Sequence, residues 1–133
     1  MQINIGLEKV EKILHVADIH IRNFKRHKEY RQVFRKLYKD AKQLPKNSII
    51  YVAGDIVHTK TDISPELVEL TSEFFRKLAD IRPTIVITGN HDANLNNSSR
   101  LDALSPIIDN LNHPNLHYLK DSGIYRVCDI DFI

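Results

Sequence analysis

The sequence of 133 residues is poor in cysteine, since Cys128 is the only one. A single cysteine excludes an internal disulfide framework and any zinc site built from several cysteines. No apolar run approaches the roughly 18 residues of a transmembrane helix. Residues 1–8 also lack a basic region followed by a long apolar stretch, which argues against a secretory signal. We therefore expect an intracellular protein, cytoplasmic or associated with a nucleoid or nucleus, without a membrane contact.

The composition is that of an ordinary globular protein, with 42% hydrophobic and 27% charged residues. The length is about that of one domain, and no repeat, low-complexity tract or linker divides it. We expect residues 1–133 to form a single domain. The chain stops on apolar residues, Phe132-Ile133, with no helix or polar tail after them. We therefore expect this domain to be a truncated unit.

The net charge of +2 conceals an uneven distribution of basic residues. Residues 22–46 contain ten Lys or Arg and two acids, which gives this segment a charge of +8. Such a basic segment attracts polyanions. It is equally typical of the solvated face of a helix, and charge alone leaves both interpretations open.

Apolar patterns alternate between short runs and helical stripes along the chain. Pro45 ends the first predicted helix, and Ser64-Pro65 is typical of the start of the second, with Ser as the cap. Predicted buried strands cover 13–17, 48–53 and 84–88, with short strands at 116–119, 124–127 and 130–133. Predicted helices cover 28–44, 64–78 and 100–111. This alternation indicates an α/β fold with βαβαβ units and a largely parallel sheet.

Polar residues able to bind metal follow three of the predicted strands. The three motifs are Asp18-Ile19-His20, then Gly54-Asp55 with His58 three residues later, and Gly89-Asn90-His91-Asp92. In open α/β sheets, ligands bind at the carboxyl ends of the strands. Each motif alone is weak, because Gly-Asp and Gly-Asn are also turn dipeptides. Their order, each after a βα crossover, predicts one shared site.

These residue types suit a two-metal site that acts on phosphorus. Two neighbouring cations need a bridging anion, and they clamp the attacking and leaving oxygens of an in-line displacement. Asp55 is the best candidate bridge, Asp18 and His20 can share a first metal ion, and Asn90 can give an amide oxygen to the second. A set of oxygen and imidazole ligands without thiolate fits manganese, iron or zinc better than calcium.

His91 follows a ligand directly and need not be one itself. Its pKa class suits a proton donor to a leaving alkoxide, or a cation that stabilises the transition state. Asp92 either orients His91 or belongs to a local turn.

The three motifs resemble those of the calcineurin-like metallophosphoesterase superfamily, over residues from about 13 to 92. The resemblance implies a layered α/β sandwich, of which this chain would be the N-terminal half. It also implies a site with two divalent metal ions, most simply manganese. Asp18, His20, Asp55 and Asn90 would be the metal ligands, and His91 the catalytic histidine.

Within this superfamily, His58 makes the chain most similar to DNA double-strand-break-repair nucleases of the bacterial SbcD type. Protein phosphatases carry Asp-Arg-Gly after the second motif and usually end the third in Glu, whereas Val57-His58-Thr59 and Asp92 stand here. The resemblance implies a DNA-cleaving exonuclease or endonuclease, with His58 assisting catalysis and an SMC-like ATPase as partner. The alternative for His58 is a surface histidine at the start of a helix.

The histidines that complete the site in this superfamily, in later Gly-His motifs, have no match here. The remaining histidines suggest other roles. We expect His15 to lie in the core or on a sheet face and His27 to be solvated. We expect no metal contact for His113 and His117. Two alternatives to the nuclease therefore stay open. One is a general phosphodiesterase for nucleotides or small substrates. The other is an inactive fragment or binding module, unless a homodimer completes the site.

Overall fold

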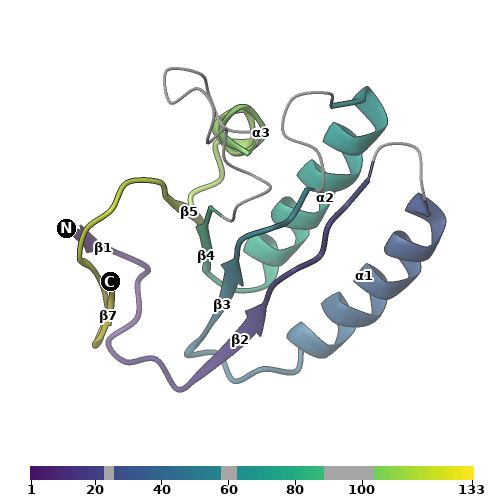
Figure 1. The fold of residues 1–133 in the computed structure, drawn as a ribbon. Helices are drawn as coiled ribbons and strands as arrows, with labels where there is room; N and C mark the ends of the chain where they lie inside the picture. The colour runs from purple at the N-terminus through teal and green to yellow at the C-terminus, as the bar shows by residue number, and fades with distance from the viewer. Residues whose placement is uncertain (23–25, 58–62, 89–103) are drawn as a thin grey trace.

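The computed structural model describes residues 1–22, 26–57, 63–88 and 104–133. Its centre is a sheet of four parallel strands in the order β2-β3-β4-β5 (Figure 1). Their bounds are Lys12–Val16 for β2, Ser48–Ala53 for β3, Thr84–Ile87 for β4 and Leu116–Leu119 for β5. Spatial order follows chain order, so each new strand is added on the same side of the last. The predicted α/β fold with parallel βαβ units is confirmed.

Three helices cover one face of this sheet. They are α1 (His27–Ala41), α2 (Pro65–Ile81) and α3 (Ser105–Leu111). Strands added in one direction through crossovers of one hand place all their helices on the same face. The core on this face is rich in aromatic rings, with Phe34 of α1 and Phe74 of α2 only 4.5 Å apart between ring centroids. Within the described residues, no helix is long and apolar enough to cross a bilayer.

A second, three-stranded sheet covers the other face (Figure 1). Its order is β1-β6-β7, with β1 at Gln2–Ile3, β6 at Tyr125–Val127 and β7 at Ile130–Phe132. Strand β3 shows why two layers are needed: Ile50 and Val52 pack toward the helices, while Ile49 packs toward the second sheet. A parallel sheet must bury both faces. The result is the layered α/β sandwich that the resemblance of the motifs implies.

Some element boundaries differ from those expected from the sequence. The first helix ends at Ala41 rather than Leu44, because the next amide groups turn back in tight bonds such as Leu44 N–H to Ala41 O, 3.1 Å. The last helix begins at Ser105, which keeps Pro106 in its first turn, where no amide hydrogen is needed. The earlier part of that predicted helix, residues 100–103, lies outside the described residues.

A strand is present near residues 13–17 as predicted, but the prediction that this strand is buried is wrong. Strand β2 lies at one edge of the parallel sheet, and the side chain of Ile13 on it is 45% exposed. The strand also ends at Val16, one residue early. An apolar run indicates a strand, but the place of that strand in the sheet depends on where the other strands pair.

Candidate metal centre

The segments that follow β2 and β3 are held side by side by backbone hydrogen bonds. The His20 amide donates to Asp55 O at 2.9 Å, and the Ile21 amide donates to Ile56 O at 2.7 Å. Ile21 also forms a parallel bridge with Val57. The side chains of Ile21, Ile56 and Val57 are fully buried and anchor both segments to the core. The parallel pairing thus continues past the strands into the two motifs.

This pairing brings Asp18, His20 and Asp55 together at the carboxyl ends of the strands. Each of the three offers one ligand atom, and these atoms all lie within 4.8 Å of one another. The Nε2 atom of His20 is 3.9 Å from Oδ1 of Asp18. Two ligand atoms bound to one ion at ~2.1 Å lie at most about 4.2 Å apart, so this pair already fits a shared ion.

The backbone at all three residues is left-handed. The φ angles are 56° at Asp18, 52° at His20 and 53° at Asp55, and Gly54 beside them has φ 83°. This conformation costs a residue with a side chain about 1–2 kcal/mol, and Asp tolerates it better than most. Such strain collects at functional sites, where the surrounding structure holds it in place. Here the hydrogen-bonded, buried segments on either side supply that hold.

Helix α1 contributes a further polar contact to the first motif. The hydroxyl of Tyr30 lies 2.7 Å from His20 O and 3.1 Å from Ile19 O, where it can donate to either carbonyl. The sequence pattern assigned Tyr30 only to the apolar stripe of the helix. A half-buried tyrosine needs a hydrogen-bond partner for its hydroxyl, so the sequence indicated that Tyr30 has one. The sequence pattern could not identify which group that partner is.

The other predicted site residues lie outside the described part of the chain. These are His58, Asn90, His91 and Asp92, in the stretches 58–62 and 89–103. The structure does describe the residues just before each stretch. Val57 is paired with Ile21 as above, and Thr88 follows β4, whose Ile87 pairs with Ala53 of β3. The two stretches that contain these residues therefore follow the carboxyl ends of β3 and β4, which are neighbouring strands.

The histidines outside the motifs do not join the cluster among the described residues. His15 lies exposed on the face of β2, with its ring 5.2 Å from that of Tyr51. The prediction of a sheet-face position is confirmed, and a core position is excluded. His113 lies 2.7 Å from a carboxylate oxygen of Asp80 on α2. His117 lies on β5, where burial lowers its pKa.

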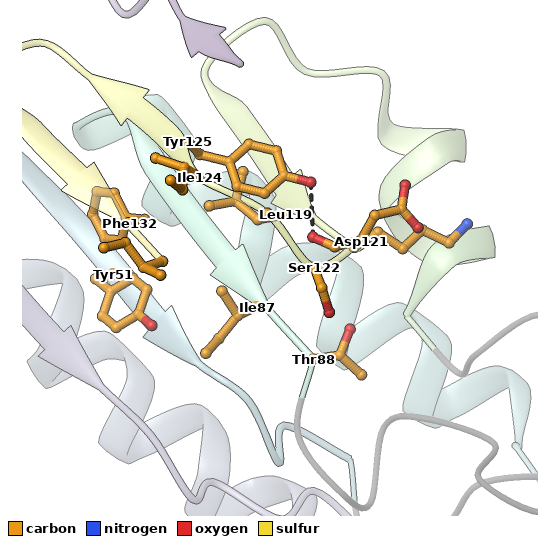
Figure 2. Close-up of a pocket in the computed structure, with 12 residues that line it drawn as sticks. Tyr51, Ile87, Thr88, Leu119, Asp121, Ser122, Ile124, Tyr125 and Phe132 are labelled. Atoms are coloured by element: carbon orange, nitrogen blue, oxygen red, sulfur yellow. Dashed lines mark hydrogen bonds between the residues drawn. The ribbon is translucent and has the colours of Figure 1, made fainter.

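A cavity of about 480 Å³ opens near the carboxyl ends of β4 and β5 (Figure 2). The rings of Tyr51 and Phe132 form one wall, with centroids 5.2 Å apart. Ser122 and Thr88 contribute hydroxyl groups, and that of Thr88 is 2.6 Å from the Tyr118 hydroxyl. The cavity combines aromatic rings with hydrogen-bonding groups, beside the strand that leads into the third motif.

Comparison with known proteins adds two findings. The model of the family described as calcineurin-like phosphoesterase matches residues 11–132. The chain is also 50% identical over 127 residues to the uncharacterized protein R555 of Acanthamoeba polyphaga mimivirus. That match covers 93% of this chain but 9% of the viral protein. The chain therefore spans less than a tenth of the length of this relative.

Proposed function

We propose that this chain is the metal-binding part of a nuclease that hydrolyses phosphodiester bonds in DNA. The chain belongs to the calcineurin-like phosphoesterase family. Membership in the family indicates a metal-dependent hydrolase of phosphate esters. The observation that carries the proposal is the cluster of Asp18, His20 and Asp55 on two adjacent strand ends. Two carboxylates and an imidazole fit manganese, iron or zinc, and manganese is our proposal.

We assign each residue of the site a role. Asp18 and His20 would hold one metal ion, Asp55 would bridge, and Asn90 would bind the second ion. Bound metal ions of this kind activate water and stabilise charge on phosphoryl oxygens. His91 would donate a proton to the leaving oxygen, and His58 would assist the cleavage of DNA. The roles of Asn90, His91 and His58 rest on the resemblance of their motifs.

A calorimetric titration with manganese tests the metal centre. We expect the chain to bind manganese with micromolar affinity and Asp55→Ala to weaken binding by more than about 100-fold, beyond the 10–100-fold effect of losing an outer contact. Asp109→Ala is the matched control, because Asp109 is an exposed carboxylate on α3. Equal affinities for the two variants would refute the site. A stoichiometry of two ions would mean that this chain completes a two-metal site, alone or as a homodimer, whereas one weakly bound ion would mean that it supplies only part of one.

A second candidate function is a phosphodiesterase that acts on nucleotides. The cavity in Figure 2 favours it, because aromatic rings and hydroxyl groups are suited to a base and a ribose. The variant His58→Ala separates the two functions. A DNA nuclease should lose cleavage of DNA while it keeps its affinity for manganese. A nucleotide phosphodiesterase should hydrolyse a small phosphodiester at an unchanged rate.

A further inference from the structure

Helix α1 carries a line of basic side chains along one face, which we call the basic stripe. Its members are Lys28, Arg31, Arg35 and Lys39 of the helix, together with Lys42, the residue that caps its C-terminal end. Steps of three or four residues place side chains on the same face of a helix. At 1.5 Å per residue, the stripe is about 21 Å long. It begins in the turn of α1 that contacts the metal cluster through Tyr30, and it runs away from that cluster along the helical layer.

The basic stripe does not stabilise the helix that carries it. Like charges three or four residues apart destabilise a helix. The two acids of α1, Glu29 and Asp40, are not three or four residues from any member of the stripe. In the described part of the chain, no member forms an ion pair within 4.0 Å. The helix dipole favours Lys39 and Lys42 near the C-terminus, but it favours neither Lys28 nor Arg31.

A recess between α1 and α2 brings part of the stripe next to a further cation. This cavity of about 250 Å³ is lined by Arg31 and Arg35 of α1 and by Lys77 of α2. Glu73 also lines it, with its carboxylate 3.2 Å from Lys77 Nζ. Three cations therefore face a single anion. Apolar side chains complete the walls, and they include Phe34, Tyr38 and Leu70.

We propose that this recess binds a phosphate group of a nucleic-acid backbone, with the rest of the basic stripe contacting neighbouring phosphates. An arginine guanidinium binds phosphate through two parallel hydrogen bonds, and apolar walls strengthen the attraction by lowering the local dielectric. Cations repeated over about 21 Å match a polyanion rather than a single phosphate. Contacts of this kind position a nucleic acid without reading its sequence. The proposal does not depend on the metal centre.

The test is the binding of a fluorescently labelled DNA duplex, followed by anisotropy in EDTA at several salt concentrations. We expect the double variant Arg35→Gln/Lys77→Gln to bind at least about tenfold more weakly than the natural chain at low salt. The number of counterions released on binding, obtained from the salt dependence of the affinity, should fall by about two, since each phosphate contact releases roughly one. The control is Lys9→Gln/Lys120→Gln, which removes the same charge from exposed positions outside α1 and α2.

Several outcomes would overturn the proposal. It is wrong if the two double variants lose the same affinity, or if the natural chain binds no DNA at low salt. It is also wrong if calorimetry detects binding of inorganic phosphate while the duplex does not bind. Melting curves of each variant, followed by circular dichroism, check that the fold is intact. Asp55→Ala should bind DNA normally in EDTA, so failure of the metal centre and failure of this site are distinguishable.

Discussion

Asp18, His20 and Asp55 all adopt a left-handed backbone, with φ between 52° and 56°. Three such residues in one small cluster are unusual, because most side chains avoid this region. The conformation stores strain that a glycine in the same place would release. We attribute the strain to the need to turn the three candidate ligand side chains toward one point immediately after the strands end.

Replacement of Asp18 should separate stability from metal binding. Asp18 is the most exposed of the cluster, with 75% of its side chain accessible. We expect Asp18→Gly to raise the free energy of unfolding by up to about 1 kcal/mol, because glycine accepts positive φ without strain. The same variant should bind manganese more weakly. Chemical denaturation and calorimetry on one preparation measure both effects.

Asp18→Asn is the control for this prediction. Asparagine tolerates the left-handed region about as well as aspartate, so the stability should stay the same while the affinity for manganese falls. If Asp18→Gly unfolds at a lower denaturant concentration than the natural chain, the strain argument is wrong.

At the scale of elements, the different faces of helix α1 make different contacts. Phe34 and Tyr38 are buried against α2 and the sheet. Tyr30 reaches back to the segment after β2, and the basic stripe faces solvent beside α2. A change on one face should therefore leave the tasks of the others largely intact.

The contact of Tyr30 with the first motif predicts a specific loss. Tyr30→Phe removes the hydroxyl but keeps the ring, which packs 5.8 Å from that of Phe34. We expect the free energy of unfolding to fall by about 1 kcal/mol, the usual value of one hydrogen bond. Because the carbonyls of Ile19 and His20 lose their anchor, the affinity for manganese should fall roughly tenfold.

Tyr125→Phe provides a matched control, since the Tyr125 hydroxyl donates to Asp121 O at 2.8 Å, away from the cluster. This variant should show a similar loss of stability and an unchanged affinity for manganese. Equal effects of both variants on the affinity would mean that Tyr30 has no positioning role. Calorimetry and urea unfolding give the two quantities.

For the whole molecule, stability depends on burying both faces of the parallel sheet at once. The helices cover one face, and the β1-β6-β7 sheet covers the other. The second sheet joins the two ends of the chain, because β1 pairs with β6 and the Met1 amino group donates to Ile124 O at 2.9 Å. We infer that the two layers unfold together, because each needs the sheet between them.

The stability of the whole molecule should also depend on pH through His117. Burial lowers the pKa of His117 from its ordinary 6.5, and its Nε2 atom is buried with no hydrogen-bond partner in the described part of the structure. The unfolded chain therefore binds a proton more readily than the folded one. The contribution of neutral, buried His117 to the free energy of unfolding is complete above pH 6.5, and it is lost as the pH falls below that value.

His117→Gln removes this titration. We expect the difference in unfolding free energy between pH 7.5 and pH 5.5 to be smaller in the variant than in the natural chain. Urea unfolding at the two pH values measures it. An unchanged difference would show that His117 makes no contribution.

The local elements and the motifs can be read from the amino-acid sequence. Apolar periodicity, Pro45 and the Ser64-Pro65 start place the main strands and helices, because these signals act over a few residues. The sequence also predicts that Asp18, His20 and Asp55 meet, because parallel strands end at a common edge. The roles of His58, Asn90 and His91 stay predictions, since these residues lie outside the described part of the chain.

The contacts between segments that are distant in the sequence are known from the tertiary structure alone. It placed β2 at an edge, paired β1 with β6 across more than a hundred residues, and brought the Tyr30 hydroxyl to the first motif. It also produced the left-handed backbone at Asp18, His20 and Asp55. The physical reason is that a local pattern records which face of an element is apolar. The partner of that face is chosen only when all the elements pack at once.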